Sequence, residues 1–236
     1  MVAALTVQSA VAKIETRGAL LVFPIKNQKE PASLWSEFFP RSAMRWEWDA
    51  GADNRVPALW HLREQLSRSS KVIYTKWFRG RATFFSREIF TAYLACLRDG
   101  FPATSLEAEA RAILRLLEDD SPLSTKQLKK QAKLEGRFQE STYNRALKDL
   151  WKRLLIVGFG EVDDGAFPSL AVGASEVMFE DLWRAAAKLN PAEAERTIRA
   201  ILGEESLFLK DFVKIRADAP KRLVGPHTVK YGGWEY

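Results

Sequence analysis

The chain of 236 residues has one cysteine, Cys96, and two histidines, His61 and His227. A single cysteine excludes an internal disulfide, and histidines so far apart with no cysteine at ligand spacing exclude the usual zinc motifs. Cys96 lies in an apolar helical pattern and is expected to be buried. No metal site is therefore expected.

Other motifs are also missing. No phosphate-binding Gly-x-x-x-x-Gly-Lys sequence and no dinucleotide-binding Gly-x-Gly-x-x-Gly sequence occurs, so we expect no nucleotide cofactor and no other cofactor. No apolar run is long enough to span a membrane, which argues against a membrane partner. The N-terminus has no basic segment before its apolar part, so it does not resemble a signal peptide. A cytoplasmic location is expected.

Positive charge is concentrated in one segment. Residues 121–157 contain nine Lys and Arg against three acidic residues, which gives +6, the formal net charge of the whole chain. The rest of the chain is therefore balanced. A surface that binds a polyanion is expected to be localised in this way.

The same segment has the pattern of a winged helix-turn-helix. Helical periodicity over residues 105–117, 125–134 and 139–154 is followed by two short extended runs around the turn Asp163-Asp164-Gly165. This order is typical of winged helices, which present their third helix to the DNA major groove. Winged helices also serve as protein-interaction modules, so that alternative stays open.

The helix over 139–154 has two faces. Its apolar residues share one stripe, and the opposite stripe carries Ser141, Arg145, Lys148 and Lys152. Such a column suits contacts to phosphates and base edges, although a solvated basic face is the ordinary alternative. The expected flanking phosphate contacts come from the preceding helix: Lys126, Lys129, Lys130 and Lys133.

The N-terminal half predicts helices over 6–16, 30–39, 55–67 and 87–97, with Asn54 and Ser86 as N-caps. Residues 71–85 predict a β-hairpin that combines the aromatics Tyr74, Trp77 and Phe78 with several cations. Aromatics beside cations can stack on bases, but they are equally common in buried strands. The hairpin cations counted as candidate DNA contacts are Lys76, Arg79 and Arg81.

The predicted fold is therefore mainly α-helical with small β-hairpins, an α+β protein with one winged helix-turn-helix. Whether the N-terminal half is a second one stays open. The expected division is an N-terminal α+β domain (1–100), the winged helix (104–173), C-terminal helices (175–216, the first of them over 175–189) and an irregular tail (217–236).

Part of the chain resembles a known bacterial family. The residues that carry the likeness are Pro122-Leu123-Ser124-Thr125, Leu128, Arg145-Ala146-Leu147, Leu150 and Leu155-Ile156-Val157-Gly158, together with the stretch 60–86. They resemble the winged-helix proteins related to the DNA glycosylases of the AlkZ/YcaQ type, over about two-thirds of the chain. The resemblance implies tandem winged helices that bind duplex DNA, and a role in DNA repair.

The resemblance also implies a test of catalysis. Enzymes of that family carry a Gln-x-Gln or Gln-x-Asp motif, and no glutamine here is followed two places on by Gln or Asp. The nearest substitute is Gln28-Lys29-Glu30, and Glu47 and Asp49 lie between tryptophans in a long loop. These carboxylates, Glu30, Glu47 and Asp49, are the weak candidates for a divergent glycosylase. The first expectation is a DNA-binding protein, and a glycosylase acting on alkylated or crosslinked bases is the alternative.

Overall fold

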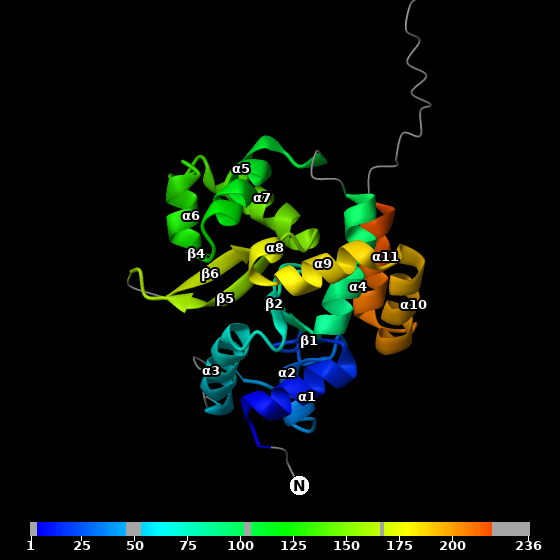
Figure 1. The fold of residues 1–236 in the computed structure, drawn as a ribbon. Coiled ribbons are helices and arrows are strands. Elements are labelled where there is room, and N and C mark those ends of the chain that lie inside the picture. Colours follow the sequence, from blue (N-terminus) through cyan, green and yellow to red (C-terminus); the bar gives the residue numbers. More distant parts are fainter. Residues whose placement is uncertain (1–3, 46–52, 102–104, 166–167, 219–236) are drawn as a thin grey trace, which may run out of the picture.

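The computed structural model describes residues 4–45, 53–101, 105–165 and 168–218. Within these ranges the chain forms eleven helices and one six-stranded antiparallel sheet (Figure 1). The expected mixture of helices with short antiparallel strands is therefore confirmed.

The N-terminal part begins each of its first two helices with a capping box, in which Thr6 and Ser33 accept hydrogen bonds from backbone N–H groups. The Asn54 cap is wrong: Asn54 has helical backbone angles, and the Asp53 carboxylate accepts from the Arg55 N–H instead. The elements are α1 (Val7–Arg17), β1 (Ala19–Leu21), α2 (Leu34–Phe38), α3 (Arg55–Arg68), β2 (Ile73–Thr75) and β3 (Thr83–Phe85).

The middle part repeats the same order of helix, strand, two helices and two strands. Ser124 begins its second helix with another capping box, closed by the Gln127 side chain. The elements are α5 (Ala108–Asp119), β4 (Leu123–Ser124), α6 (Thr125–Gln131), α7 (Glu140–Lys152), β5 (Ile156–Val162) and β6 (Ser169–Ala174). The helices expected over 105–117, 125–134 and 139–154 are found with slightly different bounds.

One sheet joins the two parts. Its strand order is β1-β3-β2-β5-β6-β4, so the second strand of each part lies at the centre. Tyr74 of β2 pairs with Gly158 of β5, and a Cβ on Gly158 would lie 2.2 Å from the Tyr74 ring. Glycine is required there because the aromatic ring occupies the space of a side chain.

Helix α3 stabilises this junction, because its side chains form hydrogen bonds with the backbone of β5 where the pairing with β6 is irregular. The β5–β6 register shifts between Gly158 and Glu161, and Gly160 has a φ of 72°. The Ser67 hydroxyl accepts from the Gly160 N–H at 3.0 Å, and Arg68 donates to the Glu161 carbonyl at 2.6 Å. The Arg63 guanidinium forms an ion pair with the Glu161 carboxylate.

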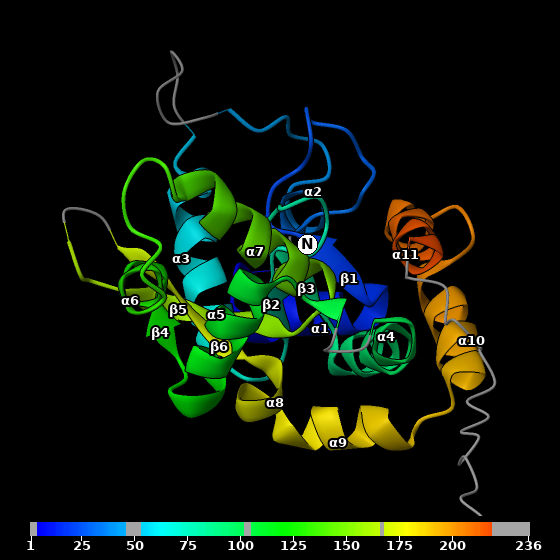
Figure 2. The same ribbon diagram turned by 90° about the horizontal axis from the view of Figure 1, so that it is seen from above.

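Most of the remaining helices lie together at the right of Figure 1 and Figure 2, whereas the two that directly follow β6 lie near the middle of Figure 1 and along the lower edge of Figure 2. The single helix expected over 175–189 is wrong, because the chain turns at Phe179, whose φ of −138° and ψ of 54° are not helical. No helix in the described part of the chain is long and apolar enough to cross a membrane. The elements are α4 (Arg87–Gly100), α8 (Ser175–Met178), α9 (Glu180–Lys188), α10 (Pro191–Leu202) and α11 (Leu207–Ala217).

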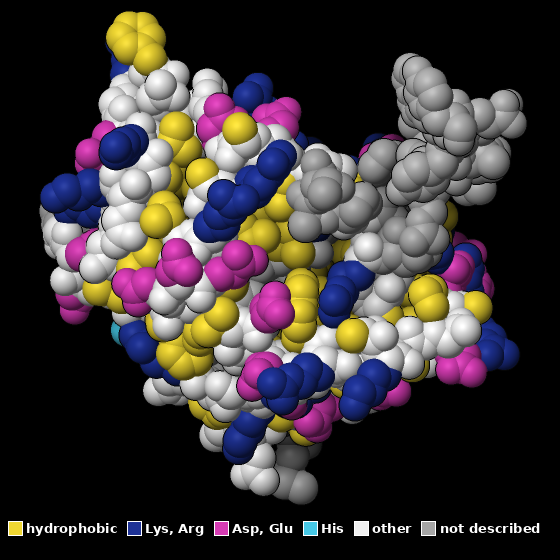
Figure 3. Space-filling model, turned by 45° about the horizontal axis from the view of Figure 1, so that its top comes forward, with side chains coloured by type: hydrophobic (Ala, Val, Ile, Leu, Met, Phe, Trp, Pro, Cys, Tyr) yellow, Lys and Arg dark blue, Asp and Glu magenta, His cyan; other side chains and the backbone are white. Residues whose placement is uncertain are grey.

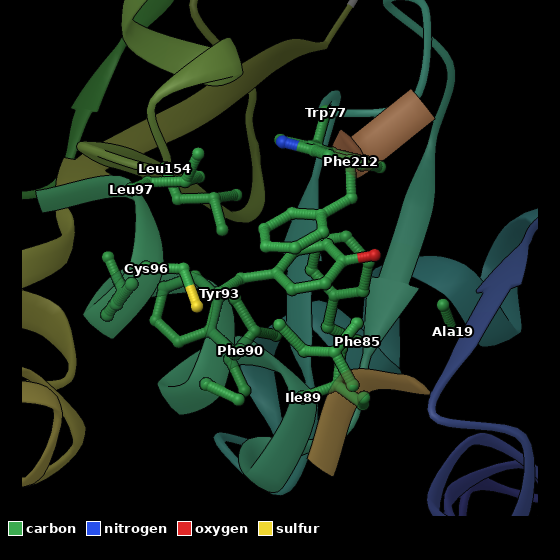
Figure 4. Packing of buried hydrophobic residues seen from close by; sticks show 14 of the residues in the cluster. Ala19, Trp77, Phe85, Ile89, Phe90, Tyr93, Cys96, Leu97, Leu154 and Phe212 are labelled. Carbon is green, nitrogen blue, oxygen red and sulfur yellow. The ribbon is translucent and has the colours of Figure 1, made fainter. Parts of the chain in front are cut away.

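A buried aromatic cluster fixes α11 against α4 and the β2–β3 hairpin (Figure 4). The Phe212 ring stacks on Tyr93, with centroids 4.5 Å apart and planes 9° apart. Trp77 lies against Tyr93 on the same side of the cluster, and its indole N–H donates to the Lys152 carbonyl at 3.1 Å. The hairpin aromatics Tyr74, Trp77 and Phe78 are all buried, so they pack in the core and are not available to stack on bases. Cys96 is buried, as expected.

Candidate nucleic-acid interface

The exposed face of α7 is the one predicted from the sequence. Tyr143, Ala146, Leu147, Leu150 and Trp151 are buried against the neighbouring helix and strands. On the opposite side Ser141, Arg145 and Lys148 are exposed, and Lys152 is half-buried. The amphipathic period of the helix therefore turns three of its four polar site residues fully to solvent.

This face opens onto a cavity of about 480 Å³ that three separate segments enclose. Helix α7, the β2–β3 hairpin and α11 each contribute side chains to its wall. We call this cavity the cationic groove. Its charged lining residues are Lys76, Arg79, Lys148, Lys152, Lys214, Asp211 and Asp218.

The two carboxylates of the cationic groove neutralise only two of its five cations. Arg79 makes a forked contact with Asp211, at 2.8 to 3.2 Å, and the Lys152 ammonium lies 3.3 Å from Asp218. Among the described residues, Lys76, Lys148 and Lys214 have no carboxylate within ion-pair distance. The groove therefore keeps a net positive charge from three unpaired lysines.

Lys76 is the most enclosed of these lysines. Burial lowers the pKa of its ammonium, and the nearby Arg63 guanidinium lowers it further. An anion that binds beside a partly buried cation without a counter-charge stabilises it, because the anion compensates the charge that burial has removed from water. Lys76 is therefore suited to contact a phosphate that enters the groove.

A second cavity, of about 350 Å³, continues along α7 past Arg145 and shares Lys148 and Lys152 with the cationic groove. Here the Arg145 guanidinium lies 3.1 Å from the Glu107 carboxylate, an exposed pair of little strength. Arg153, on the wall of the same cavity, is buried and bound to Asp149 and Ser105. Arg153 therefore supports the structure, and Arg145 stays accessible.

The α6 lysines lie outside both cavities. Lys126 donates to the Asp164 carbonyl in the β5–β6 turn at 2.6 Å, and Lys129 pairs with Glu140 at the start of α7. Lys130 and Lys133 are exposed, as is Arg81 in the hairpin turn. These five cations do not join the cationic groove, and their contact with DNA remains a prediction.

The candidate catalytic carboxylates are not brought together in the described residues. Glu30 is exposed and lines a different cavity, between α1 and the α10–α11 turn, which shares no residue with the cationic groove. Glu47 and Asp49 lie outside the described residues. Glu30 shares its cavity with Glu204 and Glu205, so that site is more acidic than the groove.

Figure 3 views the molecule from the side of α5, α6 and α7. Lys and Arg side chains alternate there with Asp and Glu and with exposed hydrophobic side chains, so the surface is mixed and not uniformly basic. Lys214 lines the groove but is not among the site residues predicted from the sequence, because the pattern of α11 does not indicate which elements lie beside it. The packing of Phe212 on Tyr93 and of Phe208 on Phe78, together with the Arg79–Asp211 ion pair, holds α11 beside α4 and the hairpin, where Lys214 reaches the groove.

The fold and the groove define a mixed α+β protein in which two repeated arrangements of helices and strands share one sheet beside a cationic cavity. The model of the AlkZ-related family matches residues 4–206, so the chain belongs to that family. Membership relates it to the DNA-repair glycosylases of the AlkZ/YcaQ type. Searches of curated proteins and of solved structures found no match.

Proposed function

We propose that this protein binds duplex DNA through two winged-helix units, with the cationic groove as the centre of the contact surface. The repeated order of helix, strand, two helices and two strands supports two such units, and α7 corresponds to the third helix of the second unit. The strand order supports the same interpretation, because each part places its first strand at the edge of the sheet, its third strand next and its second strand at the centre.

The single observation that carries the proposal is the meeting of two cation sets that lie far apart in the sequence. Lys76 and Arg79 of the hairpin share one cavity with Lys148 and Lys152 of α7, and α11 adds Lys214. Unpaired lysines that converge on one groove repel one another unless a polyanion occupies it. In this arrangement the phosphates of one strand enter the groove, and Arg145 and Ser141 contact the duplex further along α7.

The decisive test uses the charge reversal Lys148→Glu. We expect the affinity for a plain duplex to fall at least about tenfold, close to 1.4 kcal/mol, and the salt dependence of binding to weaken. The matched control is Lys188→Glu, an exposed lysine on α9 that lines none of the cavities described, which should bind like the wild type.

Both lysines are exposed, so both variants should unfold at the wild-type temperature, and a thermal melt checks that the fold is intact. Equal affinity of the two variants in a low-salt titration would overturn the proposal. The same titration with alkylated duplex, followed for released base, tests the alternative of a divergent glycosylase. Release of base would add catalysis to binding, and its absence would leave a binding protein.

A further inference from the structure

Phe138 lies in the turn between α6 and α7 with 95% of its surface exposed. The next most exposed large hydrophobic side chains among the described residues, Trp60 and Val177, reach only 46%. The turn has two residues with left-handed backbone, Lys133 at φ 56° and Gly136 at φ 92°. No atom lies within 4 Å of a Cβ built on Gly136, so the turn stands open to solvent.

The local structure gives this aromatic ring no packing role. Phe138 precedes the N-cap Gln139, a position from which an apolar side chain often packs on the fourth residue of the helix. That fourth residue is Tyr143, which is buried elsewhere and donates its hydroxyl to the Thr125 carbonyl at 2.8 Å. The contact that would shield Phe138 is therefore not made.

Several exposed cations lie close to Phe138 in the sequence. Lys130, Lys133 and Arg137 are exposed, and none has an ion-pair partner among the described residues, while Glu135 is the only acid between Lys133 and Phe138. Phe138 also stands at the N-terminal end of α7, and Lys148 and Lys152 lie near the other end of the same helix. The ring therefore lies just before the helix that carries the α7 cations, at the end opposite to Lys148 and Lys152.

We propose that Phe138 is a wedge that stacks against a base of bound DNA and disturbs its stacking on the neighbouring base pair. The proposal rests on the proposed function, because the cations of α6 and α7 must first hold the duplex. An aromatic ring on a protruding turn presents its face to a base, and its cationic neighbours contact the flanking phosphates. The ring would also meet an extruded or unpaired base more readily than a paired one.

The test uses short duplexes that each carry one 2-aminopurine at a different position, because the fluorescence of this base rises when it is unstacked. We expect wild-type protein to raise the fluorescence at one or a few adjacent positions. Phe138→Ala should abolish the rise and weaken binding about fivefold or more, whereas Phe138→Trp should retain both. Val177→Ala, which removes an exposed apolar side chain from α8, is the matched control and should behave as the wild type.

The outcomes separate this inference from the proposed function. If the wild type binds duplex with the expected dependence on Lys148 but leaves every 2-aminopurine unchanged, the wedge is wrong and the binding function stands. The same conclusion follows if Phe138→Ala retains the rise. If the wild type does not bind duplex at all, the proposed function itself fails. Since Phe138 is exposed, its variants should unfold at the wild-type temperature, which the thermal melt verifies.

Discussion

The ion pair between Arg63 and Glu161 links α3 of the N-terminal part to β5 of the middle part, and its removal should destabilise the protein strongly. The Arg63 side chain is only 4% exposed and that of Glu161 is 19% exposed. The guanidinium lies 4.2 Å from the centroid of Trp60 and 5.6 Å from that of Tyr74, and its Nε has no hydrogen-bond partner. Glu161 therefore supplies the negative charge that compensates a buried cation.

The perturbation is Glu161→Leu, which leaves Arg63 buried without its counter-charge. Removing one partner of a buried pair costs about 3–5 kcal/mol. Water can enter beside the partly exposed Glu161 position, so we expect the lower end, about 3 kcal/mol. For a chain of this size each kcal/mol lowers the midpoint of thermal unfolding by about 2–4 °C, so the expected fall is about 6–12 °C.

The assay is thermal unfolding followed by circular dichroism, with two comparisons. Glu64→Leu breaks the more exposed pair between Glu64 and Arg68 on the same helix and should cost less than about 1 kcal/mol. The double variant Arg63→Met with Glu161→Leu removes both charges and should recover most of the lost stability. A Glu161→Leu midpoint no lower than that of Glu64→Leu, or a double variant no more stable than Glu161→Leu, would refute the reasoning.

Two further predictions concern groups with shifted pKa values. Lys76→Met should raise the unfolding temperature, because burial lowers the pKa of Lys76 and so makes its charged form unfavourable in the fold. The same variant should weaken duplex binding, because it removes a cation from the groove. A variant that is less stable than the wild type would contradict this account. The Asp164 carboxylate accepts hydrogen bonds from the Ser124 and Ser169 hydroxyls, which lower its pKa in the folded state. Its stabilising contribution is therefore complete above the unfolded pKa and is lost as the pH falls through the folded one, so wild type and Asp164→Asn should differ in urea unfolding at neutral pH and converge below about pH 4.

Local chemistry was sufficient to predict most elements of this chain. The apolar stripe of α7 and the cap at Ser86, both predicted, depend on residues within a few positions of each other. Observed helix boundaries differ from the predicted ones where a single residue leaves the helical conformation. Phe179 is such a residue, and it divides the helix expected over 175–189. Nothing in the periodicity of that segment signals the turn.

The candidate site could be predicted only in pieces. The hairpin cations and the α7 cations were each recognised as charged surfaces, but no local signal indicates that they line one groove. Their meeting depends on the pairing of Tyr74 with Gly158 and on the contact of Trp77 with the Lys152 carbonyl. Contacts between residues about 80 positions apart leave no periodic trace in the sequence.

The sequence by itself determined where positive charge is concentrated, where most helices and strands form, and which face of α7 meets solvent, because these depend on side-chain type and spacing. Only the tertiary structure decided that the two halves share one sheet and that the hairpin aromatics are buried. It also decided which lysines lack a carboxylate partner. The physical reason is that burial and ion pairing depend on which surfaces pack together, and long-range packing brings α11, with Asp211 and Lys214, to the groove.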